Sequence, residues 1–300
     1  MPTVLLLGAG ASYGSDSVGI PPLGGRLFDA LAAFNPPGWG SLPLEVAARF
    51  RADFEAAMSG LGQTHAHSVP PLQRAMAAYF FGFLPRASSL YIRLAQRIAA
   101  ARWPGAVSTL NYERLLELSL GPAGLRPVVG SQTTPGRTLE LCLPHGCCHI
   151  FCEGARATSS GVSFAAFGVT TDGPVIVISD PAQHRQRIEH DAFPPVMSYF
   201  EPNKRTTAGA SFIAGQRARW AQLATEADRI VAVGIRVRTH DTHIWDPVAR
   251  SAASVVYCSG SAGGGEFDAW SRAARPQREN VVLGRHFAEE FDAICRALGI

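Results

Sequence analysis

The stretch MPTVLLLGAGASYG, residues 1–14, decides the fold. Its apolar run VLLL stops abruptly at Gly8, Ala9 and Gly10, which is typical of a buried parallel strand that turns into a helix. Such a turn presents backbone N–H groups, and glycine lets an anion approach them closely because it has no Cβ. We therefore predict that Gly8, Ala9 and Gly10 hold a phosphate-bearing ligand, with a dinucleotide as the first hypothesis.

The turn departs from the usual dinucleotide fingerprint. That fingerprint has a third glycine three residues after the second, where Tyr13 stands here, and Gly14 follows one position late. The acidic residue expected about twenty positions further on would be Asp29, but it lies in LFDALAAF, which reads as a helix. An ordinary dehydrogenase is therefore disfavoured.

Composition limits the class of protein. The chain has 300 residues, of which 47% are hydrophobic and 17% charged, so we expect one domain over residues 1–300 with a sizeable insertion, or two domains. The net charge of +3 is small and the arginines form no basic block, so direct nucleic-acid binding is not expected. The apolar runs are too short for a membrane span or a signal peptide. We expect a cytoplasmic protein without membrane contact.

The six cysteines raise the question of a metal. Four of them cluster in the sequence: Cys142, Cys147, Cys148 and Cys152. Structural zinc sites use pairs with C-x-x-C type spacing, which this cluster lacks. Cys142 is expected within a strand, and the adjacent Cys147 and Cys148 would point to opposite faces of an extended chain. We predict reduced thiols and no metal.

Secondary structure alternates along most of the chain. Residues 23–102 read as a helical insertion after the first strand. Apolar runs of strand length then follow at residues 106–110, 139–144, 174–180, 229–235, 254–260 and 280–284. Helices are expected at residues 211–228, 243–253, 266–274 and 287–298. This alternation predicts an α/β, Rossmann-like parallel sheet with helices on both faces, and residues 146–210, rich in Gly, Ser, Thr and Pro, predict a small irregular lobe.

Ligands of parallel sheets bind beyond the carboxyl ends of the strands. The segments at these ends are GAGAS with GIPPL nearby, TLNYERLLE, PHG, VGIRV followed by DTHIW, CSGS and LGRHF. The chain here resembles the sirtuin superfamily, whose members have a GAG-x-S turn, a G-I-P segment, a T-x-N motif and an H-G motif in this order. It is most similar to bacterial sirtuin-like NAD⁺ hydrolases of antiphage defence, in which the second motif commonly reads T-x-N-Y-[DE]-x-L-[LI]-E, as residues 109–117 do. EPNK and DTHIW, within residues 200–245, add to the resemblance.

The chain also departs from deacetylase sirtuins. Those generally carry G-I-P-x-F-R, whereas Pro22, Leu23 and Gly24 follow Pro21 here, and the paired zinc cysteines are missing. Both departures disfavour protein deacylation. The usual T-S or Y-S after the late glycine is replaced by Ile235 and Arg236, so a serine contact with NAD⁺ does not carry over; Arg236 either reaches a phosphate or pairs with a surface acid.

The resemblance implies cleavage of the nicotinamide bond of NAD⁺. An asparagine amide accepts from a water and donates to a ribose hydroxyl, so we expect Asn111 to orient the nucleophile. The alternative for Asn111 is a cap of the helix YERLLELSL. His145 is expected to take a proton from water or from a ribose hydroxyl, with a structural loop histidine as its alternative. His149, His243 and the pair His65 and His67 are read as structural or exposed.

Further residues at the strand ends are predicted to contact NAD⁺. They are Gly8, Ala9, Gly10, Ser12, Pro21, Gly234, Asp241, Ser259 and Phe287. Ser12 is expected to donate to a phosphate, while Asp241 and Glu113 are expected to hold loops or ribose hydroxyls.

Three functions of different classes fit these residues. The first is an NAD⁺ glycohydrolase that yields nicotinamide and ADP-ribose, as an effector of antiphage defence that depletes NAD⁺. The second is an ADP-ribosyl transferase or deacylase. The third is a non-enzymatic module that senses NAD⁺ or ADP-ribose. Because an uncontrolled NAD⁺ hydrolase would kill its host, we also expect regulation by a protein partner or by homo-oligomerisation.

Overall fold

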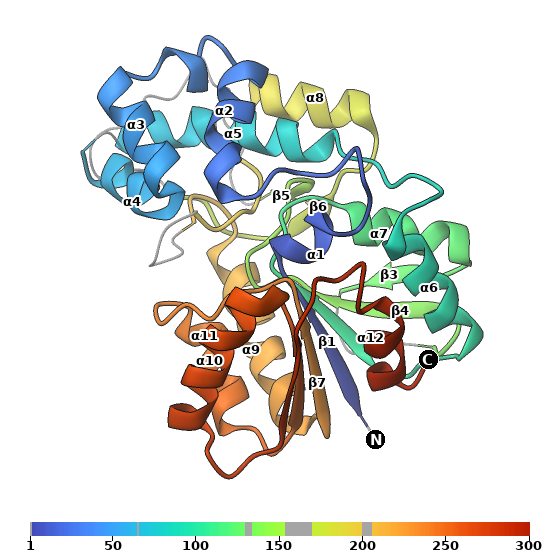
Figure 1. Cartoon of the computed structure of the whole chain (residues 1–300). Coiled ribbons are helices and arrows are strands. Elements are labelled where there is room, and N and C mark those ends of the chain that lie inside the picture. Colours follow the sequence, from blue (N-terminus) through green and yellow to red (C-terminus); the bar gives the residue numbers. More distant parts are fainter. Residues whose placement is uncertain (1, 65, 130–133, 154–169, 200–205) are drawn as a thin grey trace.

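A seven-stranded parallel sheet forms the centre of the protein, in a computed structural model that describes residues 2–64, 66–129, 134–153, 170–199 and 206–300 (Figure 1). The strand order is β3-β4-β2-β1-β7-β8-β9, and all neighbouring pairs are parallel. The strands are β1 (Thr3–Leu7), β2 (Ala106–Thr109), β3 (Arg126–Val128), β4 (Thr138–Cys142), β7 (Arg229–Val233), β8 (Ser254–Cys258) and β9 (Asn280–Leu283). The predicted α/β, Rossmann-like fold is confirmed.

Helices cover both faces of this sheet because its central strands are apolar on both sides. In β1, Leu5 and Leu7 pack on one face, while Val4 and Leu6 pack on the other, as the two-residue period of a strand requires. The first face is covered by α6 (Leu90–Ala100), α7 (Leu115–Leu120) and α12 (Phe291–Leu298). The second face is covered by α9 (Ala210–Glu226), α10 (Thr242–Arg250) and α11 (Gly260–Ala274).

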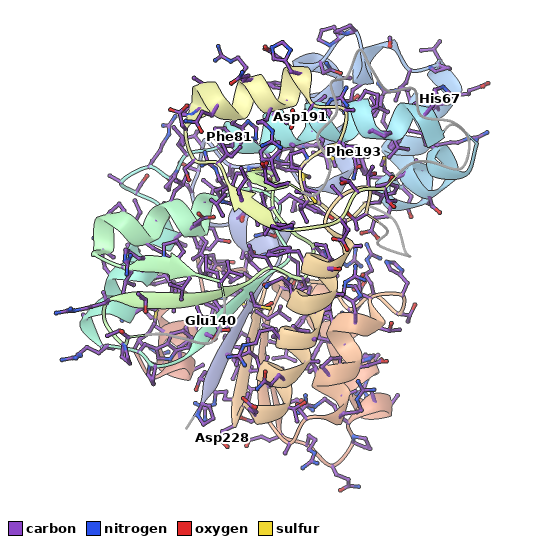
Figure 2. The ribbon with its side chains drawn as sticks, turned by 180° about the vertical axis from the view of Figure 1, so that it is seen from behind. His67, Phe81, Glu140, Asp191, Phe193 and Asp228 are labelled. Atoms are coloured by element: carbon purple, nitrogen blue, oxygen red, sulfur yellow. The ribbon has the colours of Figure 1, made fainter. Side chains whose placement is uncertain are left out.

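A helical lobe lies beyond the carboxyl ends of the strands (Figure 1). It consists of α2 (Gly24–Phe34), α3 (Leu44–Ala52), α4 (Phe54–Thr64), α5 (Val69–Phe81) and α8 (Pro181–His190), with a two-stranded antiparallel sheet of β5 (Ile150–Cys152) and β6 (Val175–Val177) beneath them. The 3₁₀ turns are η1 (Trp39–Ser41), η2 (Ala66–Ser68) and η3 (Gly121–Ala123). Figure 2 shows Phe81 and Asp191 in this lobe and Asp228 at the opposite, amino end of the sheet.

The lobe shares its core with the loops of the main sheet. Tyr112 and Leu143, which follow β2 and β4, are buried in the same apolar cluster as Trp39 and Phe50 of the lobe. Because this cluster forms around them, the loops after β2 and β4 are held between the two parts of the molecule. Those are the loops that carry the predicted residues Asn111 and His145.

Three details differ from the prediction or extend it. The run at 174–180 was expected in the parallel sheet, and that prediction is wrong, since β6 pairs with β5 in the antiparallel sheet. Strand β3 was not predicted. Within the expected insertion at 23–102, α6 packs against the main sheet rather than with the lobe. The division of the chain at 23, 102, 146 and 210 stays a prediction.

Within the described residues, none of the helices has the length and apolarity needed to cross a membrane.

Candidate functional site

The carboxyl ends of β4, β2, β1 and β7 lie side by side in the sheet. From β1 the chain continues to β2 and β4 on one side, and β7 joins β1 on the other side, so the strand order reverses at β1. Ligands of open parallel sheets bind at such a reversal. The loops that follow these four strands carry His145, Asn111, the glycine turn and Gly234.

The glycine turn packs directly against the backbone of the loop after β7. A Cβ on Gly8 would lie 2.7 Å from the carbonyl oxygen of Gly234, and a Cβ on Gly10 would lie 2.9 Å from the Cα of Gly234. Gly234 has a φ of +67°, and its own Cβ would lie 1.9 Å from the backbone nitrogen of Ala11. These glycines are therefore required by the contact between two loops, whatever ligand the turn holds.

The contact between the glycine turn and the loop after β7 also occupies some of the backbone N–H groups of the turn. Gly8 N–H donates to the carbonyl of Val233 at 3.0 Å, and Gly10 N–H donates to the carbonyl of Gly234 at 2.8 Å. Ala9 is exposed and is the first residue of α1 (Ala9–Tyr13). The N–H of a first helical residue has no acceptor within its own helix. Of the predicted anion-binding residues, Ala9 is the one whose amide lies outside these loop contacts.

Asn111 joins the loop after β2 to the glycine turn. Its amide Nδ2 donates to the carbonyl of Gly8 at 3.2 Å and to Ser12 Oγ at 2.8 Å. No hydrogen bond to its Oδ1 is formed by the residues that the structure describes. The cap of α7 comes instead from Glu113, whose carboxylate accepts from the N–H of Leu115. Asn111 is thus a bridge between two loops and not a helix cap.

Ser12 is the centre of a buried polar network. Its hydroxyl lies 2.5 Å from Glu113 Oε1 and 2.9 Å from the Tyr91 hydroxyl, and it accepts from Asn111. When Ser12 donates to Glu113, Tyr91 and Asn111 fill both acceptor positions of its oxygen. Burial raises the pKa of Glu113, while the donors Ser12 and Leu115 act in the opposite direction. The predicted phosphate donor Ser12 is fully buried and already committed to this network.

His145 is held rigidly after β4. Gly146 has a φ of +76°, and a Cβ there would lie 1.9 Å from the carbonyl oxygen of Val196, so only glycine fits after His145. The carbonyl of His145 accepts from Ser198 N–H at 2.9 Å. The imidazole is buried and stacks with the ring of Tyr112 at a centroid distance of 6.3 Å. The H-G motif therefore has a steric cause in this fold.

A second histidine lies against His145. The Nε2 atoms of His145 and His243 are 2.9 Å apart, and Asp241, two residues before His243, places a carboxylate oxygen within 4.8 Å of both rings. His243 lies in the first turn of α10, and Asp241 stands at the N-cap position of that helix without a side-chain capping hydrogen bond. From the sequence, we assigned His243 no role in the site. The feature that could have indicated one is its position, shortly after a buried strand and two residues from the predicted site residue Asp241.

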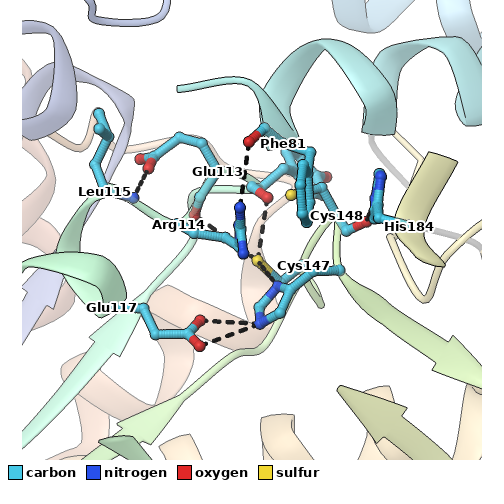
Figure 3. Close-up of polar contacts among 10 residues, drawn as sticks. Phe81, Glu113, Arg114, Leu115, Glu117, Cys147, Cys148 and His184 are labelled. Carbon is cyan, nitrogen blue, oxygen red and sulfur yellow. Dashed lines mark hydrogen bonds and ion pairs between the residues drawn. The ribbon is translucent and has the colours of Figure 1, made fainter. Parts of the chain in front are cut away.

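A network of polar contacts connects the loops that carry Asn111 and His145 (Figure 3). The Cys147 thiol donates to the carbonyl of Tyr112 at 3.1 Å, and His149 Nδ1 lies 3.1 Å from the Cys147 sulfur. His149 Nε2 lies 3.0 Å from a carboxylate oxygen of Glu117. Burial opposes a charge on His149, but its contacts with Cys147 and Glu117 raise its pKa to about 10. His149 is buried, which favours the structural one of the two interpretations considered for it.

The clustered cysteines agree with the sequence prediction only in part. Cys147 and Cys148 lie in a turn rather than in an extended segment, and their sulfurs and a nitrogen of His149 all lie within 4.8 Å of one another. All six cysteines are free and buried. The neighbouring thiols are therefore not on opposite faces of a strand, although Cys142 does end β4 as expected.

The remaining predicted residues are spread around the sheet end. Pro21 is buried, and Ser259 stands at the N-cap position of α11 directly after β8, without a side-chain capping hydrogen bond. Phe287 is buried in the core, 5.9 Å from the ring of Tyr91. Arg236 pairs with Glu266 on the surface, which is the second of the two roles considered for it. His65 and the EPNK segment at 201–204 lie outside the described residues.

No protein-family model and no curated protein sequence matches the chain. Among solved structures, it is similar to a sirtuin studied for the structural basis of sirtuin substrate affinity, at 15% identity and a TM-score of 0.48, over 98% of this chain and 92% of that one. It is also similar to Sir2 in complex with the inhibitor EX-527, 2'-O-acetyl-ADP-ribose and a deacetylated p53 peptide, at 15% identity and a TM-score of 0.48, over 100% of this chain and 94% of that one. These structural neighbours are sirtuins.

Proposed function

We propose that the protein is an NAD⁺ glycohydrolase, which converts NAD⁺ and water into nicotinamide, ADP-ribose and a proton. The observation that carries the proposal is the fixed position of Asn111, whose amide is tied to Gly8 and Ser12 at the reversal point of the sheet. His145 follows the adjacent strand β4. The four motifs that resemble sirtuins in the sequence support the same assignment. Ala9, with its exposed amide at the start of α1, is proposed to contact the pyrophosphate.

Asn111 is proposed to orient the attacking water. Both hydrogens of its amide are used by Gly8 and Ser12, which turns its Oδ1 into the acceptor for a water O–H. Nicotinamide leaves as a neutral molecule, so the reaction needs a well-placed nucleophile more than a strong acid. A rigid Asn111 supplies that placement because it cannot rotate without breaking two hydrogen bonds.

His145 is proposed to accept the proton. The oxygen of water forms a bond to the anomeric carbon of the ribose, the bond from that carbon to the nicotinamide nitrogen breaks, and one water proton passes to the imidazole and then to solvent. Burial of His145 against Tyr112 keeps the ring oriented during this transfer.

Incubation of the purified full chain with NAD⁺ tests the proposal. Free nicotinamide and ADP-ribose in equal amounts are expected, and both should disappear in His145→Ala. An ADP-ribosylated protein or an O-acyl product would instead indicate a transferase or deacylase. Binding of NAD⁺ without turnover, measured by calorimetry, would indicate a sensor module.

We further propose, from the resemblance in the sequence, that the cellular role is depletion of NAD⁺ during phage infection, under control of a protein partner or of self-association. Bacteria that express the chain with its neighbouring genes should lose NAD⁺ after infection, and cells with Asn111→Ala should not. Equal activity of the isolated monomer at every concentration would contradict control by association.

A further inference from the structure

Three side chains of the site form a cluster that the proposed reaction does not use as a unit. The ligand atoms of His145, Asp241 and His243 all lie within 4.8 Å of one another. We propose that these residues bind one divalent transition-metal ion of the zinc class, and that the bound ion inhibits NAD⁺ cleavage by occupying His145. The inhibition rests on the proposed function, whereas the binding does not.

The spacing of the two imidazoles suits a shared ion. Their Nε2 atoms are 2.9 Å apart. With metal–nitrogen bonds of about 2.1 Å, two ligands of one ion lie about 3.0 Å apart in octahedral geometry and about 3.4 Å apart in tetrahedral geometry. The two nitrogens now face each other in a hydrogen bond, so an ion that binds both replaces this bond and turns the rings, while the Nε2 atoms move apart by about 0.1–0.5 Å.

The donor set selects the class of ion. Two imidazole nitrogens and one carboxylate oxygen suit zinc, cobalt, nickel and ferrous iron, whereas magnesium and calcium prefer oxygen ligands alone. Three protein ligands leave a coordination position for water, as zinc sites with an open position do. The site is thus expected to bind Zn²⁺ and Co²⁺ and to discriminate against Mg²⁺.

The backbone holds the two arms of the cluster in place. On α10, the carbonyl of Asp241 accepts from Ile244 N–H at 2.9 Å and from Trp245 N–H at 3.0 Å. Ile244 and Trp245 are buried in the core against the sheet, which fixes the turn that presents His243. His145 is fixed by the tight contacts of Gly146 described above. The backbone of the ligand residues is therefore already ordered before an ion binds.

Charges near the cluster are mixed. Arg217 Nε donates to the carbonyl of Pro144, the residue before His145, at 3.4 Å, so a guanidinium lies close to the site. Glu55 adds a carboxylate: its charge and that of Asp241 both contribute to the raised pKa of Tyr112, although burial is the larger cause. Glu55 is paired with His240 at 3.1 Å, so Asp241 is the carboxylate that the cluster itself offers to a cation.

A second cluster, Cys147, Cys148 and His149, also has the spacing of a metal site. It is less suited to an ion because binding there would break two contacts of His149, with Cys147 and with Glu117, whereas an ion in the first cluster replaces the single hydrogen bond between His145 and His243. Thiolate ligands also give Co²⁺ intense charge-transfer absorption, so spectroscopy distinguishes the two clusters.

Cobalt titration of the untagged full chain tests the binding. One Co²⁺ per chain is expected, with visible d–d bands, no thiolate charge transfer, and displacement by Zn²⁺. His243→Ala and Asp241→Asn should each weaken binding at least about tenfold, with circular dichroism confirming that they fold. His190→Ala, an exposed histidine at the end of α8, is the matched control and should bind like the wild type. Unchanged binding in both site variants, or charge-transfer bands that vanish in Cys147→Ser, would overturn the site.

Nicotinamide release tests the inhibition. Zn²⁺ at about one equivalent should suppress turnover of the wild type, and His243→Ala should need at least about tenfold more Zn²⁺ for the same loss relative to its own metal-free rate. Activation by Zn²⁺ would overturn the inhibition. Cobalt binding by a wild type that never cleaves NAD⁺ would refute the proposed function while leaving the metal site standing.

Discussion

Asn111 and His145 follow adjacent strands, yet their surroundings are opposite in kind. Asn111 is held by a backbone carbonyl and a hydroxyl, groups that do not titrate near neutral pH. His145 lies 2.9 Å from another imidazole, a type of side chain that commonly ligates metal ions. The fold thus surrounds one half of the site, at Asn111, with groups of fixed charge and places a pair of imidazoles in the other half, at His145. Four experiments test this comparison.

The largest effect is expected when the support shared by both halves is broken. Gly234→Ala places a Cβ 1.9 Å from the backbone nitrogen of Ala11 in a residue with a φ of +67°. The free energy of unfolding should fall by about 3 kcal/mol or more, measured by urea denaturation. Gly124→Ala is the control, because Gly124 has a φ of +75° but nothing within 4 Å of an added Cβ, and should cost about 1 kcal/mol. Equal costs would contradict the steric role of Gly234.

Removal of the Asn111 amide separates binding from chemistry. Asn111→Ala should lower turnover about a hundredfold or more, roughly 3 kcal/mol of transition-state stabilisation. NAD⁺ affinity should stay within a few-fold because the pyrophosphate contacts remain. Nicotinamide release and thermal-shift titration with NAD⁺ measure the two quantities. Asn280→Ala, on the edge strand β9, is the control; wild-type turnover of Asn111→Ala would refute the role of Asn111.

Loss of the Ser12 hydroxyl should loosen the half of the site at Asn111 without removing it. Ser12→Ala deprives Asn111 of one acceptor and Glu113 of one donor. Stability should fall by about 1–3 kcal/mol, and turnover by about tenfold, less than in Asn111→Ala. Ser15→Ala is the matched control, since the Ser15 hydroxyl is also buried but donates to the Ser12 carbonyl. A turnover that falls no further in Ser12→Ala than in Ser15→Ala would show that Asn111 does not depend on this bond.

The smallest effect concerns pH. The folded pKa of His149, about 10, lies above its unfolded value of about 6.5. The stabilisation is therefore complete below pH 6.5 and is lost as pH rises toward 10, so a change of one pH unit within this window removes only part of it. Between pH 7.5 and 8.5 the melting temperature of the wild type should fall, and that of His149→Gln should fall less. Parallel curves for the two proteins would contradict a charged His149.

Much of the fold was predictable because its signals are local. The strands that the sequence placed correctly are apolar runs that end at glycine or at polar residues, as β1 does at Gly8. Strand β3 was missed because its residues RPV are mostly exposed and carry no apolar pattern. The run at 174–180 was assigned to the wrong sheet because an apolar run reveals a strand but not its partner.

The candidate site was predictable in position but not in contacts. Asn111 and His145 were selected because they follow strands and match the T-x-N and H-G motifs; their catalytic roles stay predictions. The contact of His145 with His243 joins residues 98 positions apart and depends on how the loop after β7 enters α10, which no local pattern encodes. The commitment of Ser12 to Glu113 and Tyr91 was hidden for the same reason.

The burial of all six thiols has a practical consequence for measuring this protein. A thiol reagent in solution can modify a buried cysteine only when the surrounding structure opens, so the rate of labelling reports local unfolding. Cys295 sits in α12 and Cys147 beside the candidate site, so mass spectrometry of the labelled peptides would time the opening of each part separately. A cysteine introduced at an exposed position would react with such a reagent before the six buried thiols do. Fluorescent probes can therefore be attached selectively to that position in the native protein.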